Sequence, residues 1–160
     1  MDKSIRAVTE NDIAIWFALA KESEAIIKDL IQDTSVFYEG FDTYMQAKIR
    51  QQEAFMAWEP GAGCMGIIAF SRRHNRITFL GVFEGNTYRE AGAPLMEFAL
   101  RQLDGSKEIT STVLKGSHPR LVEERQFYEH YGFQASGDTM EAGVPAIVMK
   151  RLPLLSENNR

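Results

Sequence analysis

The segment that most constrains the fold is Ile77–Phe83, a run that is apolar at nearly every position and rich in strand-forming residues. A strand of this composition is typical of the interior of a sheet. Two further apolar segments, Ala54–Trp58 and Cys64–Phe70, precede it and are separated by a turn at Pro60–Gly63. This arrangement predicts an antiparallel hairpin. The chain is therefore expected to build a sheet with Ile77–Phe83 as its central strand.

The segments on either side of this predicted sheet core show helical spacing of apolar residues. Over Ile13–Ile31 the spacing predicts one long helix or two consecutive helices, and Thr9–Asp12 resembles a capping box. Pro94 suits the first turn of a later helix, where its missing N–H has no intrahelical partner to lose. Further helices are expected at Phe41–Arg50, Pro94–Leu103 and Leu121–Tyr131, and further strands at Ile5–Val8, Glu108–Leu114, Phe133–Ser136 and Ala146–Leu152.

The order of these elements predicts the fold class. Helices interleaved with hairpins and one strand–loop–helix unit indicate an α/β (α+β) fold, with a mixed, mostly antiparallel sheet flanked by helices. The chain has 160 residues, and this length is typical of one domain. Residues 1–160 are therefore expected to form a single domain.

The charge balance argues against polyanionic partners. With 18 Lys and Arg against 22 Asp and Glu, the formal net charge is −4, so neither nucleic acid nor an anionic membrane is expected as a partner. Every apolar run is far shorter than the roughly 20 residues that cross a bilayer, and no basic and apolar leader opens the chain. We therefore expect a cytoplasmic protein.

The cysteine and the histidines do not predict a reactive or metal-binding site. Cys64 is the lone cysteine and lies in an apolar segment, so we expect a buried, inert thiol. The histidines His74, His118 and His130 show neither i, i+4 pairing on a helix nor cysteine partners at zinc-site spacing. No metal site is expected.

Two glycine-containing motifs are candidates for binding phosphate groups. The first, Gly61–Gly66, has the Gly-x-Gly-x-x-Gly spacing of dinucleotide-binding loops, but a short apolar run and a turn follow it instead of a helix. A hairpin turn explains it better, and we discard the nucleotide-dependent oxidoreductase that it would imply. The second, Arg89–Pro94, lies between an apolar strand and an amphipathic helix, where amides and the helix dipole can hold a pyrophosphate. On this segment alone, an ordinary strand-to-helix connection is the more common explanation.

A third segment, Glu123–Phe133, ends a predicted helix with the pattern Phe-Tyr-x-x-x-Gly-Phe, one strand after the Arg-x-x-Gly loop. The order of these motifs resembles the GNAT superfamily of N-acetyltransferases. The resemblance extends from Ile5–Ala7 to the closing strand Val148–Leu152 and covers nearly the whole chain. The Arg-x-x-Gly loop is a weak signal by itself, and its spacing from the second motif is the main support.

The resemblance implies a binding site for acetyl-CoA as the acetyl donor. Backbone groups of Leu80, Gly81 and Val82 would bind the pantetheine arm. Backbone amides of the loop would bind the pyrophosphate, which requires that the N–H groups between Tyr88 and Leu95 point into an open cleft. The loop residues concerned are Arg89, Glu90, Ala91, Gly92, Ala93, Pro94 and Leu95.

The activity implied is transfer of the acetyl group to a primary amine of an unidentified small molecule or peptide, by direct attack of the amine on the thioester. By the same resemblance, Tyr128 would protonate the leaving thiolate. A backbone N–H of the central strand would face the developing oxyanion. Glu84, and also Glu59, could take a proton from the amine.

Three departures from the family pattern leave a second function open. Pro94 removes one amide from the phosphate-binding loop, Leu121 stands where many members carry Asn, and the segment before Arg89 is about two residues longer than usual. The alternative is a catalytically weak, acyl-CoA-binding regulatory domain of the same fold.

Neither the acceptor nor the oligomeric state follows from the sequence. The aromatic residues Phe37, Tyr38, Phe41 and Trp58 could line an acceptor pocket or belong to the core, and the core is the more common place for them. A homodimer is among the oligomeric states left open.

Overall fold

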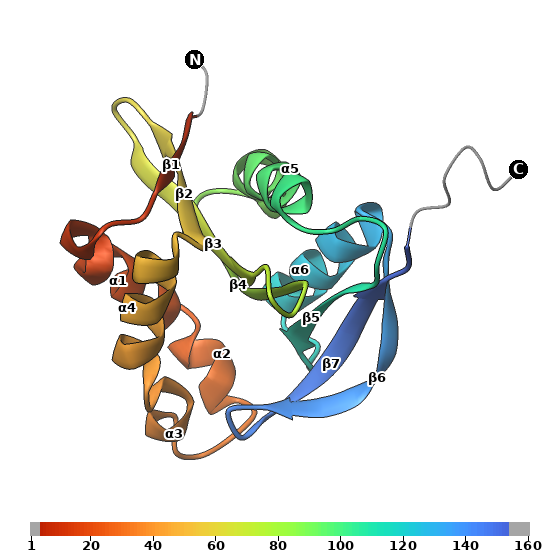
Figure 1. Ribbon diagram of the computed structural model, residues 1–160. Helices are drawn as coiled ribbons and strands as arrows, with labels where there is room; N and C mark the ends of the chain where they lie inside the picture. The colour runs from red at the N-terminus through yellow and green to blue at the C-terminus, as the bar shows by residue number, and fades with distance from the viewer. Residues whose placement is uncertain (1–3, 154–160) are drawn as a thin grey trace, which may run out of the picture.

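The computed structural model describes residues 4–153. Its strands are β1 (Ser4–Ala7), β2 (Ala54–Glu59), β3 (Gly63–Ser71), β4 (Arg76–Val82), β5 (Ile109–Leu114), β6 (Phe133–Glu141) and β7 (Val144–Arg151). They form one seven-stranded sheet in the order β1-β2-β3-β4-β5-β7-β6 (Figure 1). Every neighbouring pair is antiparallel except β4 and β5, which are parallel.

Helices cover both faces of this sheet. They are α1 (Ile13–Lys21), α2 (Glu24–Lys28), α3 (Ser35–Tyr38), α4 (Phe41–Gln51), α5 (Ala93–Gln102) and α6 (Pro119–His130), with the short turns η1 (Glu10–Asp12) and η2 (Tyr88–Gly92). Figure 1 shows α1 to α4 gathered against one face, and α5 and α6 against the other. The predicted mixed, mostly antiparallel sheet flanked by helices is therefore confirmed.

Strand β3 explains why the sheet needs helices on both faces. Four successive residues, Ile67, Ile68, Ala69 and Phe70, are each 0% exposed. Because side chains alternate along a strand, Ile67 and Ala69 pack into one core with Trp16 of α1, while Ile68 and Phe70 pack into the other core beneath α5. The sequence of β3 thus dictates two hydrophobic layers.

Most predicted elements are present, with shifts at their ends. The helical spacing over Ile13–Ile31 resolves into α1 and α2, and the Gly61–Gly66 motif forms the β2–β3 hairpin, as predicted. Helix α6 begins at Pro119, earlier than predicted, because His118 caps it by accepting the N–H of Arg120 at Nδ1 (3.1 Å).

Two elements lack the pattern on which sequence prediction depends. The four-residue helix α3 buries none of its residues, so no apolar periodicity marks it. Strand β6 extends to Glu141, beyond the predicted end at Ser136, and is exposed at nearly every position after Phe133. It is an edge strand held by its ladder with β7, and an edge strand of this kind shows little apolar alternation.

A buried ion pair fastens α4 to the end of β3. Lys48 Nζ lies 3.1 Å from Glu53 Oε1 and donates to the carbonyl of Phe70 at 2.8 Å. The other oxygen of Glu53 accepts the N–H of Arg72 at 2.7 Å. Both charged side chains are 10% exposed. Such a pair is costly to break, because removing one partner leaves the other charge buried.

We predict that Lys48→Met lowers the free energy of unfolding by about 3 kcal/mol, because Glu53 loses its buried cation and keeps only the exposed Arg72 guanidinium, 3.7 Å from Oε2. Lys48→Met/Glu53→Gln is expected to recover more than half of that loss, since Gln keeps an acceptor for Arg72. Urea unfolding followed by circular dichroism measures both values. A double variant as unstable as the single one would contradict this assignment.

Candidate functional site

The site is built where β4 and β5 separate. Within residues 4–153, Arg76 and Thr110 form the one register pair between these parallel strands, whereas β3 pairs with β4 from Gly66 to Ser71. Beyond Arg76, the carboxyl-terminal parts of β4 and β5 are therefore not joined by a ladder. Crevices at the carboxyl ends of parallel strands are common ligand sites.

Two cavities open on this space. Phe79, Leu80, Leu114 and Glu124 line both of them. The first, which we term the loop cavity, has a volume of about 340 Å³ and extends from Leu80, Gly81 and Val82 to Tyr88 and Arg120. The second, the aromatic cavity, has a volume of about 270 Å³ and is lined by Phe37, Tyr38, Phe41, Tyr44, Phe79 and the hairpin residues Glu141 and Ala142.

The aromatic cavity changes how three predicted core residues are understood. Phe37, Tyr38 and Phe41 line it, and Phe41 also packs against the core of α1 and α4, as predicted. Trp58 does not line this cavity and packs against the α1 and α4 core, with Arg6 over its ring at 5.0 Å. The cavity was not visible in the sequence, because its lining comes from helices and strands far apart along the chain.

The three residues of β4 that were predicted to bind the donor lie together in the wall of one cavity. Leu80, Gly81 and Val82 line the loop cavity, together with Glu84 just beyond the strand. The loop residue Arg89 is exposed and, with Ala93, lines a separate surface hollow. Their assignment to a ligand remains a prediction.

The loop before α5 is less open than predicted. The N–H of Tyr88 donates to Glu123 Oε2 at 2.8 Å, that of Glu90 to Thr87 Oγ1 at 3.0 Å, and that of Ala91 to the Thr87 carbonyl at 3.0 Å. The expectation that all amides between Tyr88 and Leu95 point into an open cleft is therefore wrong for these three. Thr87 and Glu123 satisfy them because an unpaired N–H is costly wherever water is excluded.

Several predicted loop residues have packing roles. Ala91 and Leu95 are 0% exposed and belong to the core beneath α5. Gly92 has an ordinary φ of −79°, but an added Cβ would meet the ring of Phe127 at 3.1 Å. A side chain at this position would therefore have to push the Phe127 ring of α6 aside by a few tenths of an ångström. Pro94 lies in the first turn of α5, as predicted.

Arg120, which sequence reasoning did not single out, cross-links α6 to the end of β4. Its guanidinium donates to the carbonyls of Val82 (2.7 Å) and Phe83 (3.3 Å). It also pairs with Glu123 at 3.0 Å and lies over the ring of Tyr88, 4.9 Å from its centre. Together, Arg120 and Glu123 hydrogen-bond to the backbone on both sides of the loop: Arg120 to the end of β4, and Glu123 to the N–H of Tyr88.

Tyr128 lies deeper than a cleft residue. It is 1% exposed, and its hydroxyl is 2.9 Å from Ser111 Oγ. Ser111 donates its own hydrogen to the carbonyl of Ile77 at 3.1 Å, so the Tyr128 hydroxyl must be the donor to Ser111. Burial, reinforced by the charge of Glu124, raises the pKa of Tyr128 well above its usual range. Its role as an acid remains a prediction.

Glu124 is the functional candidate that sequence reasoning missed. It precedes Tyr128 by four residues, which places both on one face of α6, and it lines both cavities. Burial raises the pKa of Glu124 to about 8, against the opposing effect of the Arg120 charge. A carboxyl with this pKa in a cleft is suited to proton transfer near neutral pH. Its i, i+4 spacing from Tyr128 was the available signal.

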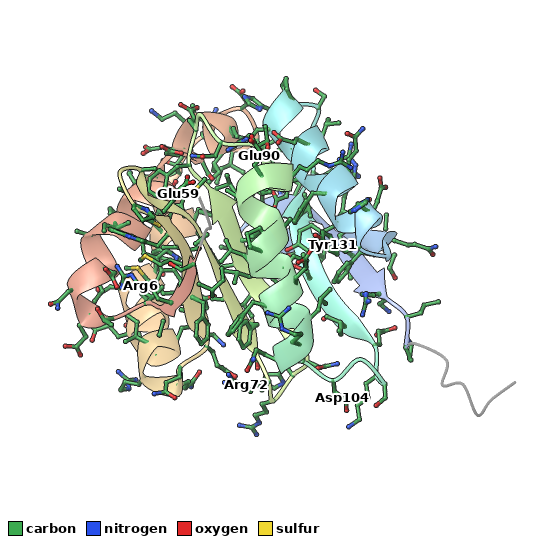
Figure 2. The ribbon with its side chains drawn as sticks, turned by 90° about the horizontal axis from the view of Figure 1, so that it is seen from above. Arg6, Glu59, Arg72, Glu90, Asp104 and Tyr131 are labelled. Atoms are coloured by element: carbon green, nitrogen blue, oxygen red, sulfur yellow. The ribbon has the colours of Figure 1, made fainter. Side chains whose placement is uncertain are left out.

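The two predicted bases lie in different surroundings. Glu84 is exposed at the rim of the loop cavity, and its N–H donates to Glu22 Oε1 at 3.0 Å. Glu59 pairs with Gly63 at the tip of the β2–β3 hairpin. Figure 2 shows Glu59 and Tyr131, which follows α6, on opposite sides of α5. Glu59 lines neither of the two cavities at the β4–β5 opening.

The cysteine and the potential metal-ligating side chains do not add a reactive group or a metal site. Cys64 is only partly buried, contrary to prediction, and burial raises the pKa of its thiol to about 11, which disfavours the reactive thiolate. Across residues 4–153, His, Cys, Asp and Glu side chains form no cluster of three that could hold a metal ion. In the same part of the chain, no helix has both the length and the apolar character needed to cross a membrane.

Comparison with known proteins decides the family. The model of the acetyltransferase (GNAT) domain matches residues 19–152. The chain belongs to the GNAT acetyltransferase family. This confirms the resemblance drawn from the Arg-x-x-Gly and Phe-Tyr-x-x-x-Gly-Phe motifs. No curated protein matches the chain.

Solved GNAT structures share the fold at low sequence identity. A GNAT-family acetyltransferase from Staphylococcus aureus Mu50 is 13% identical with a TM-score of 0.69, covering 96% of this chain and 100% of that one. The PaiA N-acetyltransferase from Thermoplasma acidophilum, solved in complex with coenzyme A, is 16% identical with a TM-score of 0.66, covering 95% and 99%. A GNAT acetyltransferase from Bacillus cereus ATCC 10987 is 14% identical with a TM-score of 0.64, covering 97% and 100%.

The position of Glu124 predicts a pH-dependent stability difference. Because its pKa is about 8 in the folded protein and near 4.3 when unfolded, the folded state binds more protons between these values. The free energy of unfolding therefore falls as pH rises through this window. We predict that Glu124→Gln has a higher Tm than wild type at pH 9, by about 2–4 °C for each kcal/mol gained, and a similar Tm at pH 4. Thermal unfolding at both pH values measures this, and equal curves at pH 9 would contradict it.

Proposed function

We propose that this GNAT protein is an acetyl-CoA-dependent N-acetyltransferase that transfers the acetyl group to a primary amine of a small molecule or peptide. The observation that carries the proposal is the separation of β4 and β5 after the Arg76–Thr110 pair. The loop and aromatic cavities meet there, at Leu80 and Glu124. A donor in one cavity and an acceptor in the other can therefore reach the same point.

In this proposal the backbone of β4 binds the donor. Leu80, Gly81 and Val82 line the loop cavity, and β5 forms no ladder with them. Apart from the Val82 carbonyl, which accepts Arg120, the polar backbone groups of these residues that face β5 are available to the amides of a pantetheine arm. Acetyl-CoA supplies an activated thioester carbonyl, and a fixed N–H of β4 can stabilise the oxyanion that forms when the amine attacks directly.

Tyr128 is proposed as the acid that returns a proton to the leaving thiolate. Its hydroxyl already donates to Ser111, so it must exchange that bond for one to sulfur. Its raised pKa makes the transfer unfavourable, since a thiol has a pKa near 8.5. The transfer is therefore expected only once the sulfur lies beside the hydroxyl.

Arg120 and Glu123 favour a second candidate function. Arg120 occupies the carbonyls of Val82 and Phe83, and the Glu123 carboxylate occupies the N–H of Tyr88. An anionic pyrophosphate must displace that carboxylate, which is also a like charge. This competition, with one amide fewer at Pro94, supports the alternative of a catalytically weak, acyl-CoA-binding regulatory domain. In either case Glu123 has to swing away, which frees Arg120 to pair with phosphate.

We predict that acetyl-CoA at 100 times its Kd stabilises the protein by about 2.7 kcal/mol, which corresponds to a rise in Tm of roughly 5–10 °C. Glu123→Gln is expected to bind acetyl-CoA about fivefold more tightly, since it removes a carboxylate from the phosphate site. Thermal-shift titration measures both, with the exposed Glu129→Gln as the control. Absence of any shift with millimolar acetyl-CoA would count against both candidate functions.

We predict that Tyr128→Phe lowers kcat about 100-fold while the Kd for acetyl-CoA stays within a factor of two, as expected for a group that acts as a proton donor. Release of free thiol during turnover measures kcat, and Tyr131→Phe serves as the matched control at the end of the same helix. Wild-type turnover in Tyr128→Phe would assign the proton transfer to another group.

An acceptor screen separates the two candidate functions. Acetyl-CoA binding together with thiol release that depends on an added amine supports the enzyme. Binding without thiol release across the amines supports the regulatory domain.

A further inference from the structure

The walls of the aromatic cavity are rich in π faces. Phe41 and Tyr44 stack with their ring centres 5.7 Å apart, and Phe79 lies 6.0 Å from Phe41. Phe37 and Tyr38 contribute a further edge-to-face pair at 5.3 Å. A wall of this kind favours an apolar or aromatic ligand body and attracts cations through the faces of the rings.

Every charged side chain that lines the aromatic cavity is acidic. These are Glu39, Glu124 and Glu141, and among the described lining residues there is no Lys, Arg or His. Opposite charges in a partly buried site attract far more strongly than in water. The electrostatics therefore favour a cationic ligand and oppose an anionic one.

Among these three carboxylates, Glu124 has no partner of its own. Glu141 accepts the hydroxyl of Thr112 at 2.8 Å and lies 3.8 Å from Arg76, and Glu39 is exposed. For Glu124, residues 4–153 provide neither an ion pair nor a hydrogen bond to the side chain. Glu124 is partly buried, and a partly buried carboxylate without a cation is less stable than a paired one. A ligand ammonium group would supply the missing cation.

Glu124 also lies where an ammonium group bound to it would be close to the proposed donor site. It lines both cavities together with Leu80, next to the strand on which the donor is proposed to lie. A ligand held at Glu124 by its ammonium end and lying on the aromatic wall would present its nitrogen toward the loop cavity.

We propose that the aromatic cavity binds a small primary amine with an aromatic or aliphatic body and no carboxylate, and that the ammonium group of this amine pairs with Glu124. The role of this amine as acetyl acceptor rests on the proposed function. An α-carboxylate on the same molecule would enter a cavity lined by three glutamates and, among the described lining residues, by no Lys, Arg or His. The nearby Arg76 is already paired with Glu141, so free amino acids are disfavoured as acceptors.

The proton balance of the step follows from this placement. The ammonium group gives one proton to Glu124, and the neutral nitrogen forms the N–C bond to the acetyl carbon as the C–S bond breaks. Tyr128 gives its hydroxyl proton to the leaving thiolate and takes the second nitrogen proton in return, and Glu124 returns its proton to solvent. No oxidant, reductant or further reactant is needed.

Binding of amines to the full chain without acetyl-CoA tests the proposal directly. Matched pairs that differ only in a carboxylate are titrated by calorimetry at pH 8.5: tryptamine against tryptophan, tyramine against tyrosine, and phenethylamine against phenylalanine. Each amine is expected to bind at least tenfold more tightly than its amino acid. Glu124→Gln is expected to weaken binding of the amines about tenfold or more, as for loss of a charge-assisted pair, while the exposed Glu129→Gln leaves it unchanged.

The outcomes separate this proposal from the proposed function. Failure of the folded protein to bind any of the three amines, equal affinity for the amino acids, or unchanged affinity in Glu124→Gln would each overturn the proposal. Thiol release from acetyl-CoA in the presence of the same amines is then measured separately. Amine binding through Glu124 without thiol release would overturn the acceptor role of these amines and would leave the amine site in place, while the acceptor screen decides the proposed transferase activity.

Discussion

The site depends on one feature of the sheet, the loss of strand pairing between β4 and β5 after Arg76 and Thr110. Elsewhere the strands are held together by antiparallel ladders of several residues. Because β4 and β5 are parallel, their carboxyl ends lie at the same edge, and the unpaired space between them opens there. Helices α1 to α4 and α6 cover this space without filling it, which leaves the loop and aromatic cavities.

Side chains of α6 satisfy part of the polar backbone that this opening exposes. Arg120 bonds to the carbonyls at the end of β4, and Glu123 accepts an N–H from the start of η2. Two residues on one turn of α6 thus bond to backbone groups beside the β4–β5 opening. Glu124, the next residue, has no partner in the described chain. On this turn of α6, Arg120 and Glu123 are hydrogen-bonded to the backbone, and a phosphate ligand must break the bond of Glu123. Glu124 on the same turn is free to pair with a ligand.

Much of the fold followed from sequence because it depends on local patterns. The apolar run of β4, the glycine turn before β3 and Pro94 at the start of α5 all occupy their predicted places. The site was harder to predict, because Arg120 and Glu124 meet β4 only through tertiary packing and look like ordinary polar residues on a helix. The loop amides were misjudged for the same reason, since Glu123 lies 35 residues away from the Tyr88 N–H that it accepts.

One wall of the aromatic cavity is formed by segments that contribute little to the hydrophobic cores. Glu141 and Ala142 belong to the β6–β7 hairpin, whose tip reaches α3, where an added Cβ on Gly143 would lie 3.5 Å from Val36 (Figure 1). Beyond Phe133 most of β6 is exposed, and α3 buries nothing, so neither α3 nor the tip of the β6–β7 hairpin anchors a hydrophobic core. Natural variation in these two segments can reshape what enters the cavity at little cost to folding, and relatives of this protein are free to diverge in selectivity there while keeping the central strands unchanged.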